Sequence, residues 1–246
     1  MKRIFDFLLS LVGLVVASPV LLVVATLVWL QDRHTPLYIA PRVGQGEREF
    51  KMVKLRSMIV DAAANEIDST SASDSRITPV GNFIRRFKLD ELMQLWNVLI
   101  GDMSLVGPRP NVKRETDLYT SVEKELLSVR PGITDLASIV FADEGDILEG
   151  HRDPDLAYNQ LIRPWKSRLA LINVENCSLI LDLRVLLLTA VAIFSRDRAL
   201  AGVQRILRDL NVDEEIRTVA LRDDSLEPSV PPGASTIVQS RQQQST

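Results

Sequence analysis

The chain has one cysteine and two histidines among its 246 residues, and this scarcity restricts its chemistry. Cys177 has no second cysteine to pair with, so an internal disulfide is excluded, and we expect it to be an inert core residue. His34 and His151 are isolated from each other and from Cys177, so no Cys/His zinc spacing exists. This composition fits a reducing compartment.

Common nucleotide-binding and hydrolase signatures are also missing. The sequence contains no G-x-x-x-x-G-K-[ST], no G-x-G-x-x-G and no G-x-S-x-G. A net charge of −3 gives no reason to expect a nucleic-acid partner. The first 56 residues, which contain a long apolar run, instead carry eight lysines and arginines against four acids. This distribution favours a protein held against anionic lipid headgroups.

The apolar run extends from Ile4 to Leu30 with Asp6 as its one charge and Ser18-Pro19 near its middle. As one helix it would measure about 40 Å, enough to cross a hydrocarbon core of about 30 Å. A cleaved signal peptide fits poorly, because Pro19 would follow the cut directly and the apolar sequence continues to Leu30.

Pro19 cannot donate a backbone hydrogen bond to Val15 and disfavours helical geometry at Ser18, so it would divide the run into pieces too short to span. Cationic residues flank both ends of the run, and both flanks therefore favour the same side of a membrane. A helix-break-helix that enters one leaflet and returns satisfies both observations, with the Ser18 hydroxyl free to bond an orphaned carbonyl. A kinked spanning helix is equally compatible with the residues alone.

Three regions follow: a membrane helix (1–31), a globular domain (32–200), and an acidic C-terminal helix with a tail (201–246). Short extended segments and turns are expected over 37–60, and a polar loop with a short helix over 61–76. Further helices are expected at 81–100, 112–129, 178–194 and 203–224, the third buried or lying in the membrane interface. The tail from Glu227 is rich in proline and glutamine, which predicts disorder.

The densest group of reactive side chains lies in "RRFKLDELMQLWNVLIGDMSLVGPRP", residues 85–110. Asp90 and Glu91 are adjacent, so on a helix they would point about 100° apart and could divide two roles rather than share one proton. Arg109, between two prolines, offers a rigid fork suited to phosphate oxygens. A solvated charged turn and a structural arginine are the simpler alternatives. Beside a lipid anchor, these residues favour phosphate chemistry at a membrane surface.

At this point the chain resembles the monotopic polyprenyl-phosphate phosphoglycosyl transferases, the bacterial initiating sugar transferases. The resemblance covers about residues 2–195 in family order. The matching stretches are "KRIFDFLLSLVGLVVASPVLLVVA" at 2–25, "PRVG" at 41–44, "FKMVKLRSMIVDA" at 50–62, "RITPVGNFIRRFKLDELMQLWNVLIGDMSLVGPRP" at 76–110, "VRPGIT" at 129–134 and "ENCSLILDLRVLLLT" at 175–189.

This resemblance implies an α/β fold, mainly helical with few short strands, in a monotopic membrane protein. Its N-terminal helix would be re-entrant and broken at Ser18-Pro19, with the domain on the cytoplasmic face of the bacterial inner membrane. The implied reaction moves a phosphosugar from a UDP-sugar to undecaprenyl phosphate and releases UMP, which initiates polysaccharide synthesis. Implied partners are these two substrates, membrane lipids, and a second copy or downstream glycosyltransferases.

Residue roles are carried over by position. Asp90 matches the nucleophile that forms a covalent phosphosugar intermediate, lies near the assisting Mg²⁺, and has Glu91 as its partner. Four further positions match phosphate-binding residues: Arg85, Arg109, Lys54 and Arg56.

The chain also departs from the family pattern. After "PGIT" it reads "DLASIVFADEGDILEG", with no arginine where many members carry a nucleotide-contacting G-R-N element. Ala170 occupies a position where many members have an acid, and Asp143, Glu144 or Asp153 are candidate replacements. Two alternatives therefore stay open: a catalytically altered membrane-anchored scaffold of a polysaccharide assembly complex, and a spanning accessory protein. The intact Asp90-Glu91 and Arg109 favour the enzyme.

Overall fold

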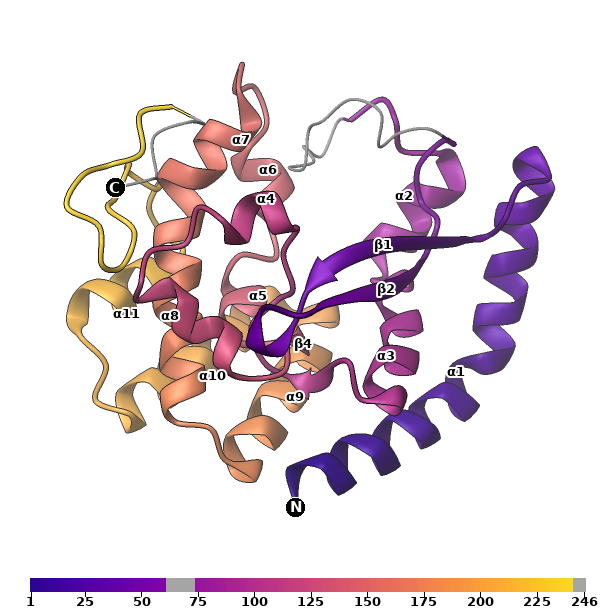
Figure 1. The fold of residues 1–246 in the computed structure, drawn as a ribbon, viewed down its shortest axis with the longest axis horizontal. Helices are drawn as coiled ribbons and strands as arrows, with labels where there is room; N and C mark the ends of the chain where they lie inside the picture. Colours follow the sequence, from indigo (N-terminus) through magenta and orange to yellow (C-terminus); the bar gives the residue numbers. More distant parts are fainter. Residues whose placement is uncertain (61–73, 241–246) are drawn as a thin grey trace.

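The protein is mostly helical with a few short strands, as the sequence predicted (Figure 1). The computed structural model describes residues 1–60 and 74–240. Its α-helices are α1 (Lys2–Asp32), α2 (Pro79–Arg86), α3 (Gln94–Ile100), α4 (Lys113–Thr116), α5 (Leu136–Val140), α6 (Glu144–Ile147), α7 (Pro154–Ala157), α8 (Arg163–Glu175), α9 (Leu179–Phe194), α10 (Arg196–Asp209) and α11 (Glu214–Leu221). Irregular helical turns are η1 (Gln45–Glu47), η3 (Glu91–Met93), η4 (Glu123–Ser128) and the π-type η5 (Tyr158–Ile162).

Two small sheets connect these helices. Strands β1 (Leu37–Val43) and β2 (Glu49–Leu55) form an antiparallel hairpin, and β3 (Ser104–Val106) pairs in parallel with β4 (Gly132–Thr134). At the second pair the backbones approach closely, since a Cβ on Gly132 would lie 2.1 Å from the Gly107 nitrogen. Glycine is therefore required there, and this close contact fixes the "GPRP" loop that follows β3.

One apolar core joins the helices of the body. Its buried side chains come from β2, α3, β3, α5, α8, α9, α10 and α11. α10 supplies Leu200, Val203 and Leu207, all buried in the same cluster as Val140 of α5. The expected boundary at residue 200 therefore falls inside α10, and the C-terminal helices complete the core of the preceding domain.

α1 is one continuous helix that bends, and Figure 1 shows its two arms running in different directions. The expected interruption at Ser18-Pro19 is wrong in this respect, because both residues stay within the helix. Pro19 still leaves the Val15 carbonyl without its usual N–H donor, and the Ser18 hydroxyl donates to that carbonyl at 2.8 Å. The predicted compensation by Ser18 is confirmed.

The N-terminal end of α1 is tied to the body by polar contacts. Lys2 pairs with Asp182 of α9, and the Arg3 guanidinium donates to the Val98 and Leu99 carbonyls at the end of α3, at 2.5 and 2.7 Å. Asp6 is 1% exposed and accepts from the Ser104 hydroxyl at 2.9 Å and the Leu105 amide at 3.2 Å.

The C-terminal end of α1 is tied to the same body. Asp32 accepts from two guanidinium nitrogens of Arg56, at 2.5 and 2.7 Å. The second arm also packs Leu21, Val24 and Val28 against Ile84 of α2. Both arms therefore rest on one globular unit.

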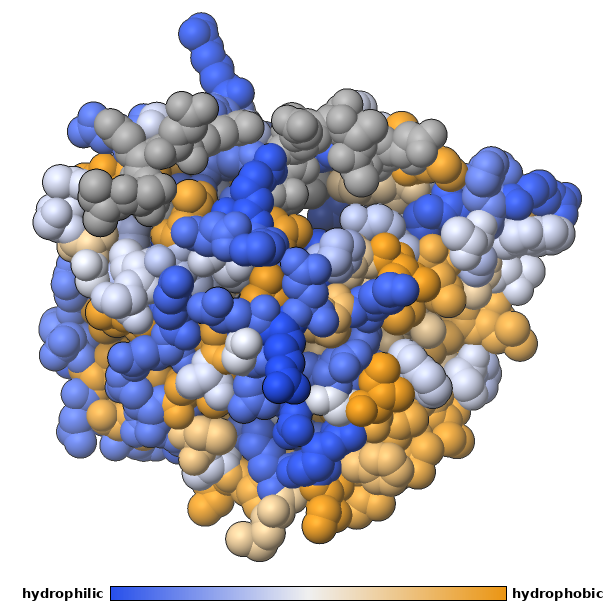
Figure 2. All heavy atoms as spheres, in the orientation of Figure 1, coloured by the Kyte–Doolittle hydropathy of each residue, from blue (hydrophilic) through white to orange (hydrophobic). Residues whose placement is uncertain are grey.

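The outer side of α1 is apolar and exposed. The helix is long and apolar enough to cross a membrane by length and composition, and it forms the hydrophobic region at the lower right of Figure 2. Exposed apolar side chains also occur on α2, α3 and α9, including Phe83, Trp96, Ile180 and Leu187. This surface is suited to contact with lipid rather than water.

Several expected elements differ in detail. The helix expected at 81–100 is divided into α2, η3 and α3, the one at 112–129 is short turns, and the one at 203–224 is α10 followed by α11; 178–194 matches α9. Cys177 is exposed rather than buried. The expected disorder is wrong for 227–240: the Ser229 amide donates to the Gln160 carbonyl at 2.9 Å, and the Gln160 side chain donates to the Val238 carbonyl at 2.7 Å. Residues 241–246 lie outside the described part of the chain. Most of the 61–76 loop lies outside the described residues.

Candidate active site

A sharp turn after α2 presents the two adjacent acids. Lys88 adopts a left-handed conformation with φ of 54°, and the Leu89 amide closes the turn onto the Ile84 carbonyl at 2.9 Å. The chain then enters η3 at Asp90 and Glu91, where the Asp90 carbonyl accepts from the Leu55 amide of β2 at 3.4 Å. The turn, rather than the middle of a helix, therefore places the acids beneath the hairpin.

Two cations face these acids from other elements. Lys54 of β2 lies 4.0 Å from Asp90, measured from Nζ to Oδ2, and Arg109 donates to Glu91 at 2.8 Å. The side chains of Lys54, Asp90 and Glu91 are each less than one-fifth exposed, whereas that of Arg109 is 39% exposed. The structure thus brings together four of the six residues predicted for the site.

Their surroundings shift the pKa values of the two carboxylates in opposite directions. Burial raises the pKa of Asp90 more than the charge of Lys54 lowers it. Burial also raises the pKa of Glu91, but the charges of Arg109, Lys54 and Lys88 outweigh it and lower the pKa to about 2. Glu91 is therefore a fixed anion bound to Arg109, while Asp90 has an ion-pair partner only at 4.0 Å.

Burial and the neighbouring charge of Arg109 together lower the pKa of Lys54 to about 8. The negative charge of Glu91 raises the pKa of Arg109 above its ordinary value. At neutral pH the site therefore holds two cations, and Lys54 is the one whose charge depends on pH near physiological values.

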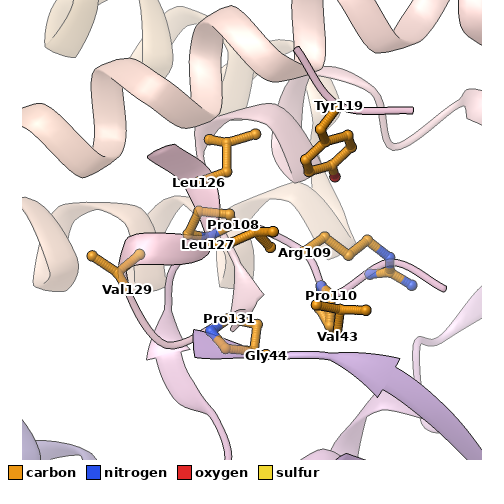
Figure 3. Close-up of a pocket in the computed structure, with 10 residues that line it drawn as sticks. All are labelled: Val43, Gly44, Pro108, Arg109, Pro110, Tyr119, Leu126, Leu127, Val129 and Pro131. Carbon is orange, nitrogen blue, oxygen red and sulfur yellow. The ribbon is translucent and has the colours of Figure 1, made fainter. Parts of the chain in front are cut away.

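Arg109 projects from a rigid loop. Figure 3 shows its guanidinium extending away from Leu127 and Val129, which line a cavity of about 10 Å³ behind the loop. This cavity holds at most one water molecule, so it is a packing gap and not a substrate pocket. Arg109 and the prolines on both sides of it also line the cavity, and the Arg109 guanidinium pairs with Glu91.

The remaining two predicted phosphate-binding residues lie apart. Arg56 is 8% exposed and bonds Asp32 and the Thr35 carbonyl, so its guanidinium holds the end of α1. Arg85 is half-buried near the end of α2, and its charge adds to the hydrogen bond from Arg76 in lowering the pKa of Asp74. Within residues 1–60 and 74–240, we find no hydrogen bond or ion pair from either arginine to Asp90 or Glu91.

Sequence reasoning missed a second ion pair near the site. Glu144, named as a possible replacement acid, pairs with Lys166 of α8. Burial raises the pKa of Glu144, but the charges of Lys166, Arg109 and Lys88 lower it overall. Lys166 gave no signal in the sequence, because it belongs to none of the matching motifs and a single lysine is ordinary.

Asp90 also fits the single carboxylate that a magnesium ion needs. Its Oδ1 atom is buried, and no hydrogen-bond partner for it is found in the described part of the chain. No group of three or more His, Cys, Asp or Glu suited to a metal occurs among the described residues. Mg²⁺ is commonly held by one or two carboxylates with substrate phosphates and water completing its shell, so this donor set is compatible with it.

The fold and this site define a membrane-associated protein whose two adjacent carboxylates face a lysine and an arginine. Over residues 1–196 the chain matches the family model described as bacterial sugar transferase, and it belongs to that family. The family membership expected from the sequence motifs is therefore confirmed.

Its relatives include enzymes named for different sugars. The chain is 36% identical over 193 residues to the UDP-glucose:undecaprenyl-phosphate glucose-1-phosphate transferase of Klebsiella pneumoniae, covering 76% of this chain and 39% of the relative. It is 34% identical over 214 residues to the undecaprenyl-phosphate galactose phosphotransferase of Salmonella typhimurium, covering 81% and 41%. The UDP-N-acetylgalactosamine-undecaprenyl-phosphate N-acetylgalactosaminephosphotransferase of Aeromonas hydrophila is 33% identical over 172 residues, covering 67% and 40%. The chain thus spans about two fifths of the length of these three relatives.

Proposed function

We propose that this protein transfers a sugar 1-phosphate from a UDP-sugar to undecaprenyl phosphate and so initiates synthesis of a polysaccharide or glycoconjugate. The observation that carries the proposal is the site itself: Asp90 and Glu91 held between Lys54 and Arg109, on a body with an exposed apolar helix. The names of the relatives support the substrate classes, and they name more than one sugar.

The first half of the proposed reaction is a displacement at phosphorus. A carboxylate oxygen of Asp90 attacks the β-phosphorus of the UDP-sugar, an Asp90–phosphosugar bond forms, and UMP leaves with the electron pair of the broken P–O bond. Arg109 and Lys54 neutralise charge on the phosphate oxygens during this step. Magnesium held by Asp90 and the substrate phosphates would supply further charge neutralisation when bound.

The second half regenerates the enzyme. A phosphate oxygen of undecaprenyl phosphate attacks the same phosphorus, the bond to Asp90 breaks, and the product is undecaprenyl diphosphosugar. Glu91 stays paired with Arg109 throughout and holds its guanidinium toward the reacting phosphate. Because the two acceptors attack in turn at one phosphorus, ping-pong kinetics follow.

The membrane arrangement is also part of the proposal. Both ends of α1 bind the same globular body, Lys2 through Asp182 and Asp32 through Arg56, so we propose that α1 enters one leaflet of the inner membrane and returns to its cytoplasmic face. A helix that crossed the bilayer would place one end about 30 Å or more from that body. Cysteines placed at positions 2 and 33 in a Cys177→Ser background are then both protected from an impermeant periplasmic thiol reagent. Labelling of either one from the periplasm contradicts the arrangement.

Release of UMP tests the reaction. The purified full chain, with Mg²⁺ and undecaprenyl phosphate, is offered a panel of UDP-sugars beside the Asp90→Asn and Asp117→Asn variants. Asp117 is the matched control, an exposed aspartate paired with Lys113. We expect release with at least one sugar, abolished by Asp90→Asn and retained by Asp117→Asn. Turnover retained in Asp90→Asn contradicts the assignment of Asp90 as the nucleophile. If the folded protein releases no UMP with any sugar of the panel, the alternative of a membrane-anchored scaffold is favoured.

A further inference from the structure

The segment that departs from the family pattern forms a wall on the far side of the site from α1. Residues 135–148 fold into α5, a turn and α6, and Glu144 at the start of α6 pairs with Lys166 of α8. In Figure 1, α6 and α8 lie on one side of the hairpin and α1 lies on the other. The two helices that carry the pair therefore lie on the side of the hairpin away from the lipid-facing helix.

Glu144 lies within electrostatic reach of the same cations as the catalytic acids. Lys88 and Arg109 act on Asp90 and Glu91, and both also act on Glu144. Arg109 is in turn affected by Glu91, Glu144 and Asp90. The charge of Arg109 therefore acts on the acids of two acid–cation pairs, Asp90 with Lys54 and Glu144 with Lys166.

The Lys166 ammonium is fixed by its ion pair with Glu144 and remains partly exposed to solvent. Its side chain is 16% exposed and that of Glu144 is 31% exposed, so an arriving ligand can reach both. The ammonium also lies 5.5 Å from the centre of the Tyr158 ring. Tyr158 begins η5, a π-type turn that runs directly into α8, and such turns occur frequently at functional sites.

The ligand that suits the Lys166 ammonium carries a phosphate group. A UDP-sugar brings two phosphates, and its UMP product carries a dianionic one that needs a cation once the P–O bond breaks. Arg109 and Lys54 are both taken up by the reacting phosphate in the proposed reaction. No arginine of the 135–150 segment is available for the second phosphate, because that segment contains none.

We propose that Lys166 binds the phosphate of the leaving nucleotide, and that Glu144 holds the ammonium in place until the donor displaces it. This inference rests on the proposed function. It assigns to α8 a contact that only the first half of the reaction uses, since the nucleotide has left before the lipid phosphate attacks.

Nucleotide binding to the full chain tests this directly. Calorimetry with UMP as the probe is carried out on wild type, Lys166→Met, Lys166→Arg and Glu144→Gln in detergent. We expect Lys166→Met to raise the dissociation constant of UMP roughly tenfold or more, since a charge-assisted hydrogen bond is lost. Lys166→Arg keeps most of the affinity, and Glu144→Gln binds UMP more tightly because the competing carboxylate charge is gone. Lys124→Met removes a lysine from an exposed lysine–glutamate pair and leaves UMP binding unchanged.

The two half-reactions supply the second readout. Exchange of labelled UMP into the UDP-sugar reports the first half, and transfer from preformed phosphosugar-enzyme to undecaprenyl phosphate reports the second. We expect Lys166→Met to slow the exchange and leave the second transfer at the wild-type rate. Equal slowing of both halves, or unchanged UMP affinity, overturns the inference. If exchange persists in Asp90→Asn, the nucleophile assignment fails instead, and the UMP affinities still judge Lys166.

Discussion

Lys54 makes the proposed reaction depend on solution pH. Its ammonium faces Asp90 from a buried position, and burial with the charge of Arg109 lowers its pKa to about 8. In the proposed reaction the protonated form binds phosphate; this form is half populated near pH 8, predominates at lower pH and is lost at higher pH. Asp90 has the opposite effect on the rate, because burial raises its pKa and the proposed attacking form, the carboxylate, is lost as pH falls.

The value of kcat/KM for the UDP-sugar is therefore expected to fall about tenfold for each pH unit well above 8, as the free enzyme loses the Lys54 charge. Lys54→Arg keeps its charge throughout this range and removes the alkaline fall while retaining the acidic one. Initial rates between pH 6 and 10 check this. An alkaline fall that persists unchanged in Lys54→Arg assigns it to another group.

At the residue level the sequence located most of the site. Asp90, Glu91 and Arg109 could be predicted because they are close together in the chain and of the types that phosphate chemistry uses. Lys54 and Arg56 looked equivalent, being two positions apart. The Arg56 guanidinium, however, bonds Asp32 and the Thr35 carbonyl at the end of α1, contacts that the sequence did not predict. Lys166 could be found near the site only from the structure, because more than 70 residues of sequence separate it from Asp90.

Among the elements, α1 shows most clearly what periodicity can and cannot predict. Length and hydropathy predicted a membrane helix, and Pro19 predicted a disturbance with Ser18 compensating. The contacts of Lys2, Arg3 and Asp6 with the body were not predictable, since their partners lie about 95 to 180 residues away. The break between α2 and η3 was also missed, because Lys88 adopts the left-handed conformation without being a glycine or asparagine.

Asp6→Leu tests how firmly the first arm is held. The substitution leaves the Ser104 hydroxyl and the Leu105 amide buried without their acceptor, which costs about 1–3 kcal/mol for each. We expect a loss of about 3 kcal/mol in the free energy of unfolding, measured by denaturant titration in detergent. Asp6→Asn keeps one acceptor oxygen and loses less. Equal stability of Asp6→Leu and wild type would mean that the arm contributes nothing to the fold.

For the whole molecule, the C-terminal helices are joined to the wall of the site. Asp143, next to Glu144, pairs with Arg196 at 2.7 Å and with Arg222 at 3.2 Å. Arg222 follows α11, beyond the 1–196 match, and also stacks over Phe141 at 5.5 Å. The sequence suggested an acidic helix and a loose tail here. The arginines that matter were overlooked because the acids outnumber them.

Asp143→Asn leaves two arginines facing each other without a counter-charge, one of them 8% exposed. Breaking a buried pair costs about 3 kcal/mol, so we expect the free energy of unfolding, measured by denaturant titration, to fall by about that amount. Asp209→Asn is the matched control, because the Arg184–Asp209 pair is 40% and 58% exposed and such pairs contribute about 1 kcal/mol or less. Similar effects of the two substitutions would show that the Asp143 contacts do not support the wall.

The bend in α1 has a consequence for how this chain can vary among its relatives. Each arm begins or ends at a fixed ion pair, Lys2 with Asp182 and Asp32 with Arg56, and the two arms meet at Pro19. An extra turn in one arm adds about 5 Å that no loop can absorb. Insertions before Pro19 are then tolerated only alongside insertions after it, so the lengths of the two arms are expected to change together across the family.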